Sequence, residues 1–346
     1  MSLPYLTSDC PGIGGRMRVE PEDFQVEERP LYLPCGEGEH LYIKVTKRLL
    51  STPDLVRKLS SVLGIKVQGI GTAGMKDARA VTTQMVSLHF ATPEQLLRVK
   101  PDDQILAIEV LGRHRNRLRP GHHAGNRFRL VVRGVADHAG ETLPAVLDVL
   151  SKRGAPNYFG PQRQGKKGEN YLLGAALLED QARREKMSRA KRMWFLNTFQ
   201  SHLFNQILAR RIDRIDRLLV GDWAIKDNGA CFPVEGAEQE QPRADRFEIS
   251  PTGILFGSRV SWASGEPGEI ERAVVIENGS TPEGLVEAAK ACGFRGERRA
   301  LRVKLDELDW SLSDNSLTIS FALPPGAYAT SVLRELMKQE SSIPGA

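Results

Sequence analysis

The stretch GIGTAGMKDARAVTTQMVSLHF, residues 69–90, opens like a nucleotide-binding loop and continues like a β-strand. Its first six residues fit the pattern G-x-G-x-x-G letter for letter. A dinucleotide loop of that type opens directly into a helix, whose free N–H groups bind the phosphate. From Val81 onward, however, β-branched residues and a period-two pattern predict a strand. We therefore expect the glycines to shape a turn and to bind no nucleotide.

The charged residues of this turn are Lys76 and Asp77. An aspartate in a glycine-flanked turn is most often a turn residue whose carboxylate accepts hydrogen bonds from nearby backbone amides. A nucleophilic aspartate needs more, because it requires a fixed cation to stay ionised and a pocket with little water. Several basic residues could supply that cation. Spacing alone therefore leaves both interpretations open.

Outward from this stretch, residues 24–30 and 40–48 alternate apolar and polar side chains, as half-buried strands do. Ser51 or Thr52 can cap a helix over residues 51–65. Elsewhere the patterns predict, in order, a strand over 81–90, a helix over 92–100, a strand over 126–135, a helix over 141–154, a helical stretch over 173–219, strands over 301–310 and 317–324, and a helix over 328–339 with Thr330 or Ser331 as its cap. A mixed α/β block, a helix-rich middle and a return to strands suggest one domain inserted into another.

Composition places the chain among globular proteins with room for two domain cores. It has 346 residues, of which 40% are hydrophobic and 26% charged. Its apolar runs are shorter than the roughly 20 residues of a membrane helix, and its first residues do not resemble a signal peptide. We therefore expect a cytoplasmic protein. The four cysteines form no C-x-x-C pair, which predicts free thiols and no structural metal.

Positive charge is unevenly distributed along the chain, whose formal net charge is +5. Residues 113–133 contain many arginines and no acidic residue. Further basic segments lie at 152–167, 182–192 and 295–304. A single charge run is usually a solvated face, but several such clusters favour a polyanionic partner such as a nucleic acid.

At GMKDARAVTTQ, residues 74–84, the chain resembles the central motif of the TruD family of tRNA pseudouridine synthases, G-x-K-D-x-x-A-x-T-x-Q. Other stretches resemble family motifs in the family's order: PEDFQVEE (21–28), GEGEHLYIKV (36–45), GNRFRL (125–130), NYFGPQRQG (157–165), FNQILARR (204–211), PTGILFG (251–257) and LPPGAYATSVLREL (323–336). Gln164 departs from the pattern, because the family usually has Phe there. The segment between residue 257 and the terminal strands also matches less well.

The resemblance implies an enzyme that isomerises a uridine of tRNA, in this family the one at position 13, to pseudouridine. The C1′–N1 bond breaks, the uracil turns and the base rejoins the ribose through C5, so no cofactor or metal is expected. The implied fold is α/β (α+β): a pseudouridine-synthase domain with a mixed, mostly antiparallel sheet over residues 1–155 and 303–346, and an inserted TRUD-type α/β domain over 156–302. We expect tRNA as the partner, no membrane, no nucleotide cofactor and a monomeric protein.

By the same resemblance, Asp77 is the nucleophile, acting either at the ribose or at C6 of the base, and Arg18 is the cation beside it, where many members carry Lys. The matching base-pocket residues are Phe24, Asn126, Phe128, Phe159 and Tyr328. Each of these aromatic residues is also a plausible core residue. The expected RNA contacts are Lys76, Arg113, Arg115, Arg117, Arg119, Arg163, Lys166, Lys167, Arg189, Lys191 and Arg192.

A rival interpretation from another class is a non-catalytic RNA-binding or RNA-chaperone protein with the same fold. The basic clusters fit both interpretations equally. Asp77 with Arg18 distinguishes them, because a binding module does not need a carboxylate held ionised by a fixed cation.

Overall fold

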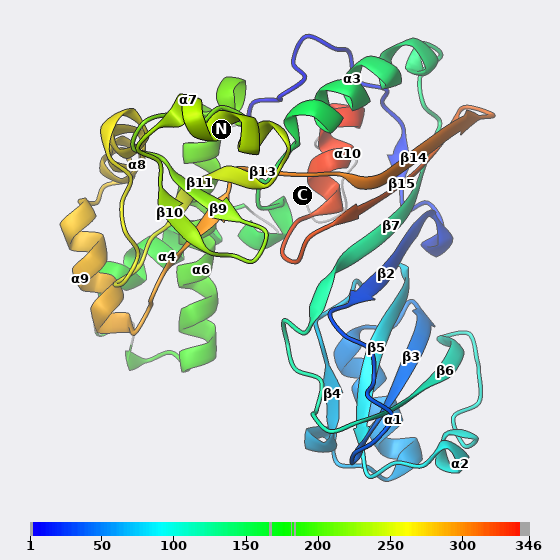
Figure 1. The fold of residues 1–346 in the computed structure, drawn as a ribbon. Helices are drawn as coiled ribbons and strands as arrows, with labels where there is room; N and C mark the ends of the chain where they lie inside the picture. The colour runs from blue at the N-terminus through cyan, green and yellow to red at the C-terminus, as the bar shows by residue number, and fades with distance from the viewer. Residues whose placement is uncertain (1–2, 166–167, 181, 183–184, 340–346) are drawn as a thin grey trace. The chain divides into compact units, whose positions relative to one another are not determined.

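The computed structural model describes residues 3–165, 168–180, 182 and 185–339, and the chain divides into two compact units (Figure 1). The large-sheet unit comprises Gly15–Asp137 and Asp306–Gly326. The helix-rich unit comprises Met1–Gly14, His138–Leu305 and Ala327–Ala346. Each unit thus combines segments that are far apart in the sequence. The division at residues 156 and 302, which follows the family's insertion, stays a prediction.

A nine-stranded sheet forms the large-sheet unit, with β1 (Arg16–Met17) beside β7 and β4 beside β5. The remaining strands follow the order β14 (Asp306–Ser313), β15 (Ser316–Leu323), β7 (His123–Arg133), β2 (Phe24–Pro30), β5 (Val81–His89), β3 (His40–Arg48) and β6 (Ile105–His114), while β4 spans Ile70–Thr72. Only the pair β2–β5 is parallel among the described strand pairs of this sheet. The predicted fold class, a mixed and mostly antiparallel sheet with helices, is confirmed.

Helix α1 (Thr52–Leu63) covers one face of this sheet. Ser51 caps it by accepting a hydrogen bond from the Asp54 N–H, and Gly64 ends it in the left-handed conformation with φ of 69°. Its Leu55 and Leu59 are buried against apolar side chains of β3 and β5. The unit also contains the short helix α2 (Pro93–Leu96) and single 3-10 turns at Pro21–Asp23 and Val67–Gly69.

The helix-rich unit is built around α6 (Arg189–Arg210), whose Leu196, Phe199 and Leu203 are buried in its core. Its other helices are α3 (Ala139–Arg153), α4 (Asn170–Glu179), α7 (Ala237–Asp245), α8 (Gly265–Glu277), α9 (Pro282–Cys292) and α10 (Ala329–Met337), with 3-10 turns at Pro161–Gln164 and Ile212–Arg214. A four-stranded antiparallel sheet has the order β10 (Cys231–Pro233), β9 (Trp223–Lys226), β11 (Ile249–Leu255) and β12 (Glu297–Ala300), and β8 (Ala155–Pro156) pairs with β13 (Arg302–Val303).

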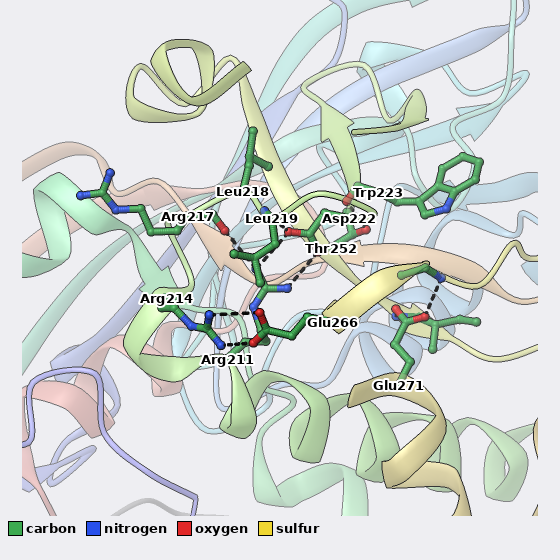
Figure 2. A network of polar contacts seen from close by, with 12 residues as sticks. Arg211, Arg214, Arg217, Leu218, Leu219, Asp222, Trp223, Thr252, Glu266 and Glu271 are labelled. Atoms are coloured by element: carbon green, nitrogen blue, oxygen red, sulfur yellow. Dashed lines mark hydrogen bonds and ion pairs between the residues drawn. The ribbon is translucent and has the colours of Figure 1, made fainter. Parts of the chain in front are cut away.

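Buried ion pairs fix the loops of this unit, and Figure 2 shows one of them among its neighbours. The Arg211 guanidinium donates to both carboxylate oxygens of Asp222, at 2.9 Å and 3.0 Å, and Asp222 also accepts from the Leu219 N–H at 2.8 Å. Glu271 receives the Arg298 guanidinium at 2.5 Å and two backbone N–H groups. Both guanidinium groups are buried, and the carboxylates that face them each accept several hydrogen bonds.

Several local predictions differ from the structure. The helix predicted over 173–219 is interrupted, because α4 ends at Glu179 and α6 begins at Arg189. The predicted cap of the last helix is wrong: Tyr328 is the N-cap residue of α10 and makes no side-chain capping bond. Among the described residues no helix is long and apolar enough to cross a membrane, and no group of three or more His, Cys, Asp or Glu side chains could hold a metal. The cysteines are free thiols, as predicted.

Candidate active site

The loop at residues 73–80, here called the Asp77 loop, connects the antiparallel strands β4 and β5. No helix follows Gly74, so the nucleotide-binding geometry that GIGTAG suggested is not formed. Gly69, Gly71 and Gly74 all have ordinary φ angles, so the backbone conformation does not itself require glycine at these positions. Gly71 is instead required by close packing: a Cβ there would lie 2.4 Å from the Leu118 carbonyl oxygen.

Lys76 anchors the Asp77 loop from within the unit. Its backbone N–H donates to Thr52 Oγ1 at 3.0 Å, and its ammonium lies 2.5 Å from Glu28 Oε2. Glu28 Oε1 accepts the Met85 N–H at 3.0 Å, which ties the pair to β5. The side chains of Lys76 and Glu28 are only 4% and 1% exposed. Lys76 therefore offers no ammonium group to solvent, and we leave it out of the proposed RNA contacts.

Asp77 itself is half exposed and faces Arg18. Arg18 Nη2 lies 3.6 Å from Asp77 Oδ2, with exposures of 12% and 49% for the two side chains. Sequence spacing left the partner of Asp77 open, and the structure brings these two residues together. Burial lowers the pKa of the Arg18 guanidinium, the charge of Asp77 opposes that shift, and Arg79 adds to it. An arginine nonetheless stays protonated in proteins, so Asp77 faces a permanent positive charge.

Arg18 is held in an unusual conformation. Its φ of 54° lies in the left-handed region, which costs a non-glycine residue roughly 1–2 kcal/mol. Its guanidinium carbon lies 3.9 Å from the centroid of the Phe24 ring, which fixes the side chain by stacking. Its Nε is buried and has no hydrogen-bond partner among the described residues. Backbone strain and an unsatisfied donor at one residue are features that point to a functional site.

Phe24, which stacks on this arginine, meets Phe128 of the neighbouring strand β7. Their rings meet edge to face with centroids 6.3 Å apart, and Phe128 also packs on Phe321 at 5.7 Å. Both are nearly buried, so they serve as core residues of the sheet as well as candidate pocket walls. Asn126 lies opposite Glu28 in the register of β7 and β2, and its Oδ1 is buried with no hydrogen-bond partner in the described part of the chain. This unsatisfied acceptor is available to a ligand donor.

Phe159 and Tyr328 belong to the helix-rich unit, where their rings lie 6.1 Å apart. Asn205 pins the Phe159 backbone through two hydrogen bonds of 2.9 Å. The Arg299 guanidinium carbon is 4.1 Å from the Phe159 ring centroid, and burial lowers the pKa of Arg299 to about 10. Arg299 was not singled out from its basic segment. That Phe159 and Tyr328 line the base pocket next to Asp77 remains a prediction.

The basic residues predicted to contact RNA differ in how free they are. Arg115, Arg117 and Arg119 are exposed, although Arg115 pairs with Glu37 and Arg117 donates to the Ile70 carbonyl at 2.6 Å. Arg113 is half-buried and donates to the Ala91 carbonyl at 3.1 Å. In the helix-rich unit, Arg189 and Lys191 are exposed, whereas Arg163 and Arg192 are partly buried. Lys166 and Lys167 lie outside the described residues.

One residue near Asp77 escaped the sequence analysis. Lys47 is fully buried in β3, and its Nζ lies 3.4 Å from the backbone carbonyl oxygen of Asp77. The available signal was its position: counting in twos along β3, Lys47 follows Ile43 and Val45 on the apolar face. The alternation predicts an apolar residue at position 47, and the lysine departs from it.

Known proteins resemble this chain along its whole length. A family model described as tRNA pseudouridine synthase D (TruD) matches residues 1–186 and 182–336. A tRNA pseudouridine synthase D of Geobacter sulfurreducens is 40% identical, with 97% of each chain covered. One from Anaeromyxobacter dehalogenans is 41% identical over 99% of this chain and 98% of the relative.

Solved structures give the same result. A crystal structure from Methanosarcina mazei, of a protein assigned as tRNA pseudouridine synthase D, superimposes with a TM-score of 0.84 and 26% identity. The superposition covers 99% of this chain and 100% of the other. The fold, the motifs around Asp77 and these matches over nearly the full length agree, and the chain belongs to the TruD family of tRNA pseudouridine synthases.

Proposed function

We propose that this chain converts the uridine at position 13 of tRNA to pseudouridine, with Asp77 as the nucleophile. The observation that carries the proposal is the pair formed by Asp77 and Arg18, 3.6 Å apart beside the Phe24 ring. A fixed guanidinium orients the carboxylate that faces it, and a nucleophile must be oriented toward the reacting atom. A protein that only bound RNA would have no use for a strained arginine facing this carboxylate.

In the proposed reaction, the ionised Asp77 attacks the ribose at C1′ or adds to C6 of the uracil. The C1′–N1 bond breaks, the uracil turns, a C1′–C5 bond forms, and the C5 proton is lost while N1 gains one. Substrate and product are isomers, so the balance needs no oxidant, reductant or co-substrate. Both routes begin from the same carboxylate, and Arg18 stabilises it in each.

Before the reaction, the target uridine must leave its stack in the folded tRNA, at a cost of a few kcal/mol. Stacking on an aromatic ring offsets about 1–3 kcal/mol per base, a role we assign to Phe128, with Phe24, Phe159 and Tyr328 as further walls. The buried and unsatisfied Asn126 Oδ1 would accept a hydrogen bond from the uracil. The exposed arginines Arg115, Arg117 and Arg119 would bind phosphates without reading sequence.

We propose that the active protein is a monomer located in the cytoplasm. Its catalytic domain would span residues 1–155 and 303–346, and residues 156–302 would form an inserted domain that grips the tRNA. The basic residues Arg163, Arg189, Lys191 and Arg192 of that segment support such a grip. Sedimentation of the purified protein with and without tRNA measures the oligomeric state.

The test is incubation with an unmodified tRNA transcript, followed by chemical mapping of pseudouridine without any added cofactor. The native chain is expected to modify position 13, and Asp77→Asn is expected to give no product while binding tRNA with unchanged affinity. Asp103→Asn, at an exposed aspartate of the same unit, is the matched control and should remain active. Product from Asp77→Asn would exclude the assigned nucleophile. Binding without product by the native chain would favour the RNA-binding alternative.

A further inference from the structure

Lys47 occupies a position where strand β3 should carry an apolar side chain. Residues on this face alternate as Leu41, Ile43, Val45 and Lys47, and the three apolar ones belong to the core beneath α1. Lys47 is as buried as they are, with 0% of its surface exposed. Lys44, by contrast, lies on the opposite face and reaches Glu27 near the surface, 2.6 Å away. The two lysines of one strand thus have opposite environments.

The Lys47 ammonium binds backbone and not a carboxylate. It donates to the Leu50 carbonyl oxygen at 2.5 Å and to the Asp77 carbonyl oxygen at 3.4 Å. Within the described part of the chain, no carboxylate forms an ion pair with it. Burial lowers its pKa to about 8, while Asp77 opposes this shift and Lys76 adds to it. An ammonium without a counter-ion is expensive to bury, so stability alone would favour an apolar residue at this position.

Besides the Arg18 pair with the Asp77 carboxylate, three contacts act on residues 76 and 77 of the Asp77 loop, and they differ in what they fix. Thr52 Oγ1 accepts the Lys76 N–H, and Glu28 binds the Lys76 ammonium, so both act on the residue before Asp77. Of these contacts between described residues, the one from Lys47 acts on the peptide group of Asp77 itself. Because the carbonyl carbon and the side chain share one Cα, fixing the carbonyl restricts where the Asp77 carboxylate can point.

We propose that Lys47 is a positioning residue, which fixes the Asp77 carbonyl while Arg18 holds the Asp77 carboxylate. The inference rests on the proposed role of Asp77 as the nucleophile. Lys47 touches no substrate in this scheme and acts only through Asp77.

Single-turnover pseudouridine formation by Lys47→Met and Lys47→Gln tests the inference, with Lys44→Met as the matched control on the same strand. Lys47→Met should lower the rate of the chemical step about 10- to 100-fold, because a charge-assisted hydrogen bond to the loop is lost. Its affinity for tRNA should stay within about twofold of the native value. Lys47→Gln keeps a donor without the charge and should recover part of the rate. Lys44→Met should be unchanged.

A purely structural lysine would give a different pattern. Lys47→Met should unfold at a temperature no lower than the native chain does, because an unpaired buried charge has been removed. If both Lys47 variants unfold at lower temperature than Lys44→Met, or fail to fold, Lys47 supports the fold and the inference is overturned. An unchanged rate in Lys47→Met overturns it as well. The Asp77→Asn variant then shows which proposal is wrong. If Asp77→Asn is also active, Asp77 is not the nucleophile. If Asp77→Asn is inactive, Asp77 remains the nucleophile and only the role of Lys47 is excluded.

The pH dependence adds a readout that a packing role would not produce. The charged groups facing Lys47 are Asp77 and Lys76. As the pH rises through about 8, the Lys47 ammonium of the native chain loses its proton and the rate should fall. In Lys47→Gln this fall should be absent. A native rate that is flat from pH about 7 to about 9 would contradict the role of the charge.

Discussion

Charges around Asp222 in the helix-rich unit and around Asp77 in the large-sheet unit are arranged in opposite ways. In the helix-rich unit, Arg211 and Asp222 are 2% and 0% exposed, and Arg211 donates to both Asp222 carboxylate oxygens. In the large-sheet unit, the nearly buried Arg18 faces a carboxylate that is 49% exposed, at the longer distance of 3.6 Å. Lys47 has carbonyl oxygens as its only described partners.

This contrast distinguishes a pair that holds the fold from charges that we assign to the proposed chemistry. A buried ion pair whose hydrogen bonds are made on both sides holds loops in place, and removing one partner is strongly destabilising. A buried cation without a matched anion lowers stability, and such residues are found where function requires them. The chain tolerates unmatched positive charge around Asp77, where the proposed chemistry needs it.

The largest effect on stability is expected from Glu271→Ala in the helix-rich unit. This variant leaves the buried Arg298 without its carboxylate, which should lower the free energy of unfolding by about 3–5 kcal/mol. Urea denaturation measures it. Glu266→Ala, which removes a surface partner of Arg214, is the control and should change stability by less than about 1 kcal/mol. Equal losses of unfolding free energy in the two variants would contradict the proposed distinction between matched buried pairs and surface pairs.

Arg18→Ala should act on turnover and not on folding. It removes the fixed cation beside Asp77, so the chemical rate should fall about 100- to 1,000-fold while tRNA affinity changes little. Arg18→Lys keeps the charge and should recover much of the rate. Single-turnover kinetics and filter binding measure the two quantities, with the exposed Arg16→Ala as the control. A loss confined to affinity would make Arg18 a phosphate contact.

A smaller effect concerns the pH dependence of stability at Lys47. Its pKa in the folded chain is about 8, below the ordinary value of 10.5. Between these values the unfolded chain binds more protons, so this residue's contribution to stability increases as the pH rises and is lost as the pH falls through about 8. The stability advantage of Lys47→Met over the native chain should therefore shrink from pH about 7 to about 10. A constant difference in denaturation experiments would contradict the buried, unmatched ammonium.

The smallest effect on stability is expected at the surface, from Arg115→Ala. Its pair with Glu37 is exposed on both sides and should contribute less than about 0.5 kcal/mol to folding. If Arg115 binds a tRNA phosphate, the slope of log affinity against log salt should decrease by about 1. Titrations at several salt concentrations measure that slope. An unchanged slope would remove Arg115 from the proposed RNA contacts.

Local patterns predicted several elements well but missed others, such as β6, α8 and α9. The alternation over residues 24–30 and 40–48 matches β2 and β3 residue for residue, and Ser51 caps α1 as expected. Features that depend on distant residues were not predictable in this way. Glycine is required at position 71 because folding brings the Leu118 carbonyl oxygen against it. The burial of a lysine at position 47 is explained by its contact with the Asp77 carbonyl oxygen. The choice of Arg18 as partner of Asp77 came from the family resemblance, because spacing alone left several cations open.

The central claim is that the carboxylate of Asp77 performs chemistry while that of Asp222 holds the fold. Parallel measurement of Asp77→Asn and Asp222→Asn tests it most directly, by thermal unfolding and by single-turnover pseudouridine mapping in unmodified tRNA. We predict that Asp77→Asn keeps the native unfolding temperature and forms no product, whereas Asp222→Asn unfolds at lower temperature and is active while folded. Pseudouridine formed by Asp77→Asn at a rate near the native one would contradict the account.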